Sequence, residues 1–285
     1  MFLGLESEYI DFQNQFSKFS ENYFSTRAKQ SPKLELLWQS IRYSFDSGGK
    51  KFRPFLSYLI SKTYNIDLEK VFSIALACEM IHTYSLIHDD LPCMDNDDLR
   101  RGIPTNHKKF GEDIALLAGD ALQAEAFKCI SSDLKNSAEQ KIKVIDIFSD
   151  CVGAHGMVGG QVLDMKANIN TTLVELENIH QLKTGDLITA TVMGAAIFCD
   201  VSQDDLNHLK TFSIHLGLAF QIKDDLLDGL DGQQDHKSYL KILGSEKTEQ
   251  ILKLRSDLAN KALLALSVNS EILKKLVIFN QSRSK

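Results

Sequence analysis

The chain has 285 residues, of which 44% are hydrophobic and 25% are charged, and its formal net charge is −6 at pH 7. These values are ordinary for a globular protein with a sizeable core. The acidic balance argues against a nucleic-acid partner, which would require a basic face. The sequence has no basic patch that suits an anionic membrane and no run of about eighteen apolar residues, so stable membrane insertion is not expected.

The cysteines and the N-terminal residues favour a cytoplasmic protein. The five cysteines are scattered, odd in number and free of CxxC spacing, which indicates reduced thiols rather than disulfides or zinc. The opening residues, MFLGLESEYIDF, contain no basic segment and no long apolar run. We therefore expect no signal peptide.

Helices are predicted throughout the chain. Only four prolines occur, and the sequence after Pro104 is free of proline breaks. Apolar residues recur at intervals of three and four, and alternating strand patterns are missing. No linker, repeat or low-complexity tract divides the chain. We predict a single all-α domain over residues 1–285, with about ten helices.

The first 30 residues predict one amphipathic helix. Its apolar face is interpreted as core packing and consists of Tyr9, Phe12, Phe16, Phe19 and Phe24.

A glycine-rich turn, GGKKFRP, follows at residues 48–54. Paired glycines let the backbone approach an anion closely, and Lys50 and Arg53 supply charge-assisted donors. A turn of this kind is also common in loops that bind nothing.

The densest group of charges lies between residues 89 and 98. A cluster of carboxylates repels itself unless it is solvated or binds cations, and Mg²⁺ takes one or two carboxylates together with substrate phosphate oxygens. Arg100 and Arg101 follow at once, and arginines are common donors to phosphate. We interpret the stretch as a magnesium–diphosphate site, with a solvated acidic loop as the alternative. The five carboxylates are Asp89, Asp90, Asp95, Asp97 and Asp98.

A second acid cluster follows at Asp224, Asp225 and Asp228. Asp224 and Asp228 are four residues apart and share one helical face, which Gln221 joins. Carboxylates embedded in apolar helical sequence need a partner, and metal is the expected one.

Eight motifs of this sequence resemble, in order and spacing, those of short-chain trans-prenyl diphosphate synthases, and bacterial farnesyl diphosphate synthases (geranyltranstransferases) most of all. DDLPCMDNDDLRRG is similar to the first aspartate-rich motif of that family, and DDLLD is similar to the second. The others are GGKKFRP, IHTYSLIHDD at 81–90, LAGDAL at 117–122, GMVGGQVLD at 156–164, KTGDLI at 183–188 and GLAFQIKDD at 217–225.

The resemblance implies the isoprenoid synthase fold, in which helices surround a central apolar cavity. It implies a prenyltransferase that joins isopentenyl diphosphate to dimethylallyl or geranyl diphosphate by magnesium-assisted ionisation, giving farnesyl diphosphate and pyrophosphate. Three Mg²⁺ ions and a homodimer are implied as well.

The resemblance also assigns roles to individual residues. Asp89, Asp90, Asp95, Asp224, Asp225 and Asp228 would bind magnesium. Isopentenyl diphosphate would be bound by Lys50, Arg53, His82 and Arg101, and the allylic diphosphate by Arg100, Lys183 and Lys237. Thr184 and Gln221 would act in catalysis with Lys183 and Lys237, and the cavity would be lined by Gln161 and Phe220.

Three local features modify this assignment. Pro92 lies between Asp89 and Asp95 and is expected to disturb the helix. Gly185 predicts a helix break that exposes carbonyl oxygens beside Lys183. The segment after Asp228 is shorter than in the family and lacks one expected lysine, which puts loop closure over the diphosphate in doubt.

Product length depends on the residues below the first acid cluster. Helical count places Ser85 under Asp89, whereas the resemblance selects Tyr84, because farnesyl synthases of this bacterial type carry an aromatic residue there. We expect farnesyl diphosphate as the main product. A geranylgeranyl diphosphate synthase, a weakly active modulatory subunit and a terpene cyclase are the alternatives.

Overall fold

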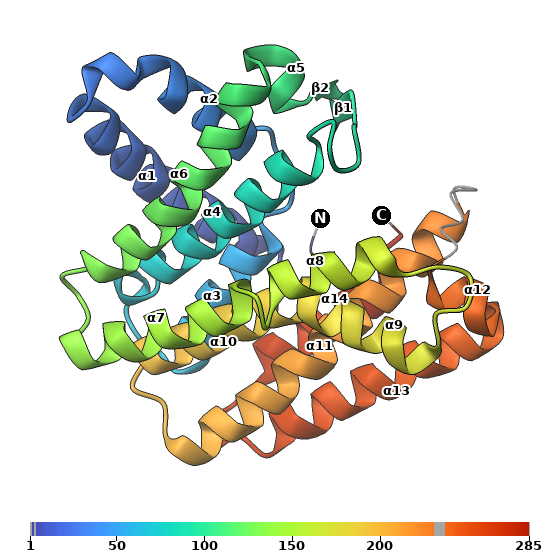
Figure 1. Ribbon diagram of the computed structural model, residues 1–285. Helices are drawn as coiled ribbons and strands as arrows, with labels where there is room; N and C mark the ends of the chain where they lie inside the picture. Colours follow the sequence, from blue (N-terminus) through green and yellow to red (C-terminus); the bar gives the residue numbers. More distant parts are fainter. Residues whose placement is uncertain (1, 3, 231–236, 285) are drawn as a thin grey trace.

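The structure is a computed structural model that describes residues 2, 4–230 and 237–284. Within these residues it contains twelve α-helices of eight residues or more and two of five, which confirms the all-α prediction (Figure 1). The α-helices are α1 (Glu6–Lys29), α2 (Glu35–Phe45), α3 (Phe52–Thr63), α4 (Phe72–Asp89), α5 (Asn106–Phe110), α6 (Glu112–Ser131), α7 (Ala138–Val152), α8 (Met157–Lys166), α9 (Leu173–His180), α10 (Asp186–Phe198), α11 (Gln203–Leu230), α12 (Tyr239–Leu243), α13 (Ser245–Leu264) and α14 (Glu271–Ser282). Short 3₁₀ turns η1 (Pro32–Leu34) and η2 (Leu68–Lys70), a π-helical turn η3 (Gln181–Gly185) and two strands, β1 (Leu99–Arg100) and β2 (Ile103–Pro104), complete the described elements.

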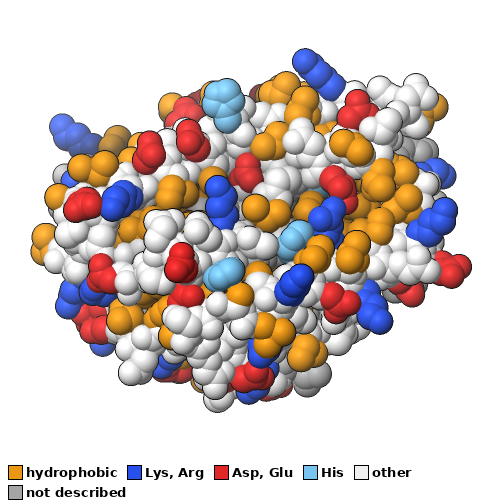
Figure 2. Space-filling view, turned by 90° about the horizontal axis from the view of Figure 1, so that it is seen from below, with side chains coloured by type: hydrophobic (Ala, Val, Ile, Leu, Met, Phe, Trp, Pro, Cys, Tyr) orange, Lys and Arg blue, Asp and Glu red, His pale blue; other side chains and the backbone are white. Residues whose placement is uncertain are grey.

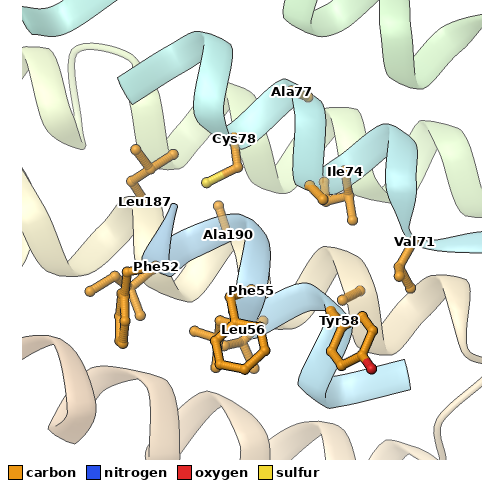
Figure 3. Packing of buried hydrophobic residues seen from close by; sticks show 14 of the residues in the cluster. Phe52, Phe55, Leu56, Tyr58, Val71, Ile74, Ala77, Cys78, Leu187 and Ala190 are labelled. Atoms are coloured by element: carbon orange, nitrogen blue, oxygen red, sulfur yellow. The ribbon is translucent and has the colours of Figure 1, made fainter. Parts of the chain in front are cut away.

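Helices α4 and α10 form the centre of the molecule. Both are apolar around most of their circumference, and such helices are stable only inside a protein. They pack against each other and against α3. Figure 3 shows Phe55 of α3, Cys78 of α4 and Ala190 of α10 lying close together in this core. The remaining helices surround this group, and α6 lies along α4 (Figure 1).

The predicted N-terminal amphipathic helix is confirmed as α1. Of its apolar face, Phe19 is partly buried against the core and the other four aromatic residues are buried. The ring of Phe12 lies 5.3 Å from that of Phe55 on α3. Just before α1, the ring of Phe2 lies 4.6 Å from that of Phe279 on α14, so the two ends of the chain meet (Figure 1).

The π-helical turn η3 lies between two helices that approach it through glycines. A Cβ atom added to Gly160 of α8 would lie 2.4 Å from the main-chain nitrogen of Lys183, and one added to Gly217 of α11 would lie 2.9 Å from the Cα of Gly185. The predicted break at Gly185 is wrong, because this residue keeps right-handed helical angles (φ −68°, ψ −38°). The helix is widened for one turn rather than interrupted, and such turns are frequent at functional sites.

The prediction that Pro92 disturbs the helix is confirmed. Helix α4 ends at Asp89, and the chain then folds back so that the Asp95 N–H donates to the Asp89 carbonyl at 2.8 Å. Strands β1 and β2 follow as a hairpin whose two central residues, Arg101 and Gly102, have φ of 54° and 79°. Positive φ at both positions is the requirement of a type I′ turn.

Some predictions concern parts or properties that the structure does not test. The shortened segment after Asp228 falls largely on residues 231–236, which lie outside the described residues, and the single-domain assignment stays a prediction. Over the described ranges, none of the helices has the length and apolar character needed to cross a bilayer. On the face drawn in Figure 2, acidic, basic and apolar side chains are interspersed.

Gly160→Ala should lower the free energy of unfolding by about 1–3 kcal/mol, the usual cost of overpacking. The new methyl group meets main-chain atoms of η3, which cannot rotate away. Gly229→Ala is the control, because there the methyl group meets only side-chain atoms of Leu240, whose nearest atom is a terminal methyl carbon. Urea unfolding of both variants tests this, and equal stabilities would contradict the close approach of α8 to η3.

Candidate active site

The first acid cluster lies at the C-terminal end of α4. Arg100 donates from Nε to both oxygens of the Asp90 carboxylate, at 2.7 and 2.9 Å, so Asp90 is buried as an ion pair. The Asp89 carboxylate has no hydrogen bond or ion pair with any other residue that the structure describes. Burial raises the pKa of Asp89 to about 6, with Lys183 opposing and Asp95 adding to the shift. A cation at Asp89 would offset this unfavourable burial.

Four basic residues are predicted to bind the same diphosphate. All four line one cavity of about 310 Å³. They reach it from four different segments: Lys50 precedes α3, Arg53 lies on α3, His82 on α4 and Arg101 in the hairpin turn. Burial and the guanidinium groups of Arg53 and Arg101 hold the pKa of His82 well below its ordinary value. His82 is therefore neutral and can hydrogen-bond without adding charge.

Two glycines allow this convergence. The Arg101 Nη1 donates to the Gly48 carbonyl at 2.6 Å. A Cβ atom on Gly49 would lie 2.8 Å from the guanidinium carbon of Arg101, and the φ of 92° at Gly49 disfavours any residue with a Cβ. The next residue but one, Lys51, has a positive φ of 47° and also lines this cavity, where it pairs with the buried Glu79 at 2.9 Å.

The second acid cluster lies on α11, and two of its carboxylates accept hydrogen bonds from other segments of the chain. Asp225 is buried and accepts a hydrogen bond from the Tyr239 N–H of α12 at 2.7 Å, and burial raises its pKa to about 7. Asp224 accepts a hydrogen bond from Arg283 at 2.6 Å. Arg283 also donates to the Phe220 carbonyl at 2.9 Å, and its guanidinium lies 4.3 Å from the centre of the Phe220 ring.

A second cavity of about 160 Å³ lies beside the first. Asp225 and Asp228 line it together with Lys183 and Lys237. Lys183 forms an ion pair with Asp164 of α8 at 2.6 Å, and the Lys237 Nζ donates to the Asp164 main-chain carbonyl, also at 2.6 Å.

Thr184 and Gln221 line both cavities and therefore stand between them. Phe220 lines the first cavity. Gln161 lies on α8 with a buried Oε1 that has no hydrogen-bond partner among the described residues.

The two candidates for the chain-length floor lie on α4. Tyr84 is buried, and its ring lies 5.7 Å from that of His88. Ser85 is half-buried, and its hydroxyl donates to the His82 carbonyl.

The carboxylates that the structure describes form no group of three or more that could hold a metal ion by itself. This arrangement is compatible with magnesium, which uses one or two carboxylates and takes its other ligands from substrate phosphates and water. The unpartnered Asp89 carboxylate and the exposed Asp95 fit that requirement. Asp90 and Asp225 are already held by protein donors.

Comparison with known proteins identifies the family. A family model described as Polyprenyl synthetase matches residues 34–253. The chain belongs to the polyprenyl synthetase family. It is 41% identical over 274 residues to the farnesyl diphosphate synthase of Bacillus subtilis (strain 168), covering 91% of this chain and 93% of that protein. It is 46% identical over 195 residues to the geranylgeranyl diphosphate synthase of Cyanophora paradoxa, covering 67% of this chain and 65% of that protein.

A solved structure agrees with this placement in the polyprenyl synthetase family. The apo structure of an FPP/GFPP synthase from Zymomonas mobilis superimposes with a TM-score of 0.83 at 33% identity. The match covers 94% of this chain and 98% of that chain.

Two residues of this polyprenyl synthetase were missing from the sequence-based set of site residues. Arg283 lies 55 residues beyond Asp228, near the end of the chain, and no motif marks it. Glu79 precedes the acid cluster by ten residues and was hidden by the apolar character of α4. Arg283 pairs with Asp224, and Glu79 pairs with Lys51. Such pairs of residues distant in the sequence cannot be found from spacing alone.

Arg283→Met should lower the free energy of unfolding by about 2 kcal/mol in the absence of metal, because a hydrogen bond to a charged group is lost from a largely buried pair. Urea unfolding measures this. Lys274→Met is the control: it removes a cation from α14, the helix that ends just before Arg283. Its partner Glu271 is 66% exposed, so the expected change is within about 0.5 kcal/mol. Equal changes in both variants would show that the Arg283–Asp224 pair contributes no more than a surface pair.

Proposed function

We propose that this prenyltransferase condenses isopentenyl diphosphate with dimethylallyl and geranyl diphosphates, and that farnesyl diphosphate is its main product. The observation that carries the proposal is the pair of adjacent cavities with Thr184 and Gln221 between them. The first cavity is rich in basic side chains: the four predicted residues line it with Lys51 and Arg283, beside Glu79 and Asp224. The other is lined by two lysines and three aspartates. Two diphosphates could therefore be held side by side, one in each cavity.

Each substrate would be bound by its own cations. Lys50, Arg53 and Arg101 would bind isopentenyl diphosphate, with neutral His82 as a hydrogen-bond donor. Lys183 and Lys237 would bind the allylic diphosphate in the second cavity, and Arg100 stands beside Asp89 at the first acid cluster. Holding both substrates in one geometry removes much of the entropic barrier to their reaction.

The chemical step would depend on charge withdrawal from the leaving diphosphate. Asp89 and Asp95, with carboxylates of the second acid cluster, would hold magnesium, which when bound supplies positive charge to the diphosphate oxygens. Lys183 and Lys237 would stabilise the negative charge that develops as the carbon–oxygen bond breaks. Thr184 and Gln221, between the cavities, would direct their dipoles at the allylic cation until the double bond of isopentenyl diphosphate attacks it. The proton that is then lost would pass to the released pyrophosphate.

A geranylgeranyl diphosphate synthase is the second candidate, since such a protein is among the relatives. The buried aromatic ring of Tyr84 favours the shorter product. A terpene cyclase would have no use for a separate basic cavity, the one lined by Lys50, Arg53 and His82. A modulatory subunit would not need both acid clusters. The homodimer, the count of three magnesium ions and the cytoplasmic location stay predictions.

Turnover should require Mg²⁺ and fall about a thousandfold or more in Asp89→Ala, because one carboxylate of a metal clamp contributes several kcal/mol to transition-state stabilisation. The assay supplies isopentenyl diphosphate with each allylic diphosphate and separates the products by length. Asp146→Ala, which removes an exposed carboxylate of α7, should keep wild-type turnover. Near-normal activity of folded Asp89→Ala would refute the metal assignment, and an inactive wild-type protein would refute the proposed function.

Tyr84→Ala should shift the products toward longer chains, because removal of a buried aromatic ring opens space that the rigid interior does not refill. Ser85→Phe should shift them toward shorter chains. Tyr84→Phe is the matched control, since it keeps the ring, and its products should equal those of the wild type. An unchanged product spectrum in Tyr84→Ala would show that the chain-length floor lies elsewhere.

A further inference from the structure

Two lysines from distant segments converge on one residue, Asp164. Lys183 belongs to the π-helical turn η3, and Lys237 immediately precedes the Ser238 cap of α12. The Lys183 Nζ lies 2.6 Å from a carboxylate oxygen of Asp164. The Lys237 Nζ lies 2.6 Å from the Asp164 carbonyl oxygen and 3.9 Å from its carboxylate. Asp164 thus offers two separate acceptors to the two cations.

The local structure of α8 explains both acceptors. Gly160 lies one turn before Asp164 and on the same face, and its missing Cβ lets α8 approach the main chain of Lys183. That approach brings the Asp164 carboxylate within reach of the Lys183 ammonium. Asp164 also lies in the last turn of α8, which ends at Lys166. Carbonyls of a last helical turn carry partial negative charge and attract cations, as Lys237 does here.

We propose that Asp164 is a positioning residue that orients Lys183 and Lys237 toward the allylic diphosphate before the substrate binds. This inference rests on the proposed function and adds a residue to it. An ammonium group has three N–H donors, so Lys183, which gives one to Asp164, keeps others for phosphate oxygens. Asp164, Lys183 and Lys237 line the same cavity of about 160 Å³, so these remaining donors lie at its wall.

The physical advantage is preorganisation. Lysine has a flexible four-carbon stem, and an unanchored ammonium loses conformational entropy when it meets a developing charge. A residue that holds the stem beforehand removes this cost from the transition state. Asp164 also carries negative charge, which weakens ground-state attraction of an anionic substrate. Its removal should therefore reduce kcat without raising KM for the allylic diphosphate.

The test is steady-state kinetics of Asp164→Asn, which keeps the shape and the main-chain carbonyl but loses the charge. We expect kcat to fall about tenfold or more, equivalent to about 1.4 kcal/mol, with KM for either substrate within threefold of wild type. Asp164→Glu, which retains a carboxylate, should recover most of the loss. Asp146→Asn makes the same charge change on the exposed face of α7 and should leave kcat unaltered. Wild-type kcat in Asp164→Asn, or a raised KM at unchanged kcat, would overturn the proposal.

A second measurement does not depend on turnover. Under native conditions, acetic anhydride should acetylate Lys183 at least threefold faster in Asp164→Asn than in the wild type, as followed by mass spectrometry. Lys237 should change little, because its main-chain acceptor remains, and the exposed Lys166 of the same helix is the internal control. Unchanged labelling of Lys183 would overturn the proposal. If the wild type were inactive, the proposed function would fail, while the labelling would still show whether Asp164 holds Lys183.

Discussion

Ion pairs between carboxylates and cations from different segments of the chain hold the site together. Asp90 at the end of α4 is paired with Arg100 of the hairpin, and Asp224 of α11 with Arg283, just beyond α14. Glu79 and Asp164 are paired in the same way, with Lys51 and Lys183. Ion pairs of this kind contribute little net stability, but breaking one is costly, so they fix which segments meet. The helices around the two cavities are thereby held in one arrangement.

The two cavities separate like charges. Two diphosphates in one low-dielectric space would repel each other strongly, because Coulomb interactions are weakly screened away from water. Here the cations of the basic cavity come from the loop before α3, from α3, from the hairpin and from Arg283 just beyond α14, whereas those of the second come from η3 and the residue before the α12 cap. Thr184 and Gln221, which are neutral, occupy the boundary. Uncharged dipoles at that position can stabilise a passing carbocation without binding it permanently.

Much of this arrangement could be predicted from the sequence because its signals are local. Helical periodicity, the scarcity of proline and the two acid clusters are each visible within a short window, and so is the glycine pair at 48–49. Contacts between residues that are distant in the sequence left no such signal. Neither the Arg283–Asp224 ion pair nor the Lys237–Asp164 hydrogen bond could be found by spacing. The π-helical turn was also missed, because a glycine indicates where a helix weakens but not whether tertiary packing keeps it helical. Packing of α8 and α11 against Gly185 and its neighbours decided that point.

A π-helical turn contains one residue more than the α-helical turn it replaces, and it therefore sets the rotational register of everything around it. Each residue of an α-helix advances the side-chain direction by about 100°. If a single residue were deleted between α9 and α10, the helix could close into a continuous α-helical form, and Lys183 and Thr184 would be rotated away from the residues they now face. The active site thus depends on a backbone insertion as well as on side chains. Comparison of related chains by substitutions alone would overlook such a change, whereas a one-residue gap in this stretch would indicate an altered cavity around Lys183 and Thr184.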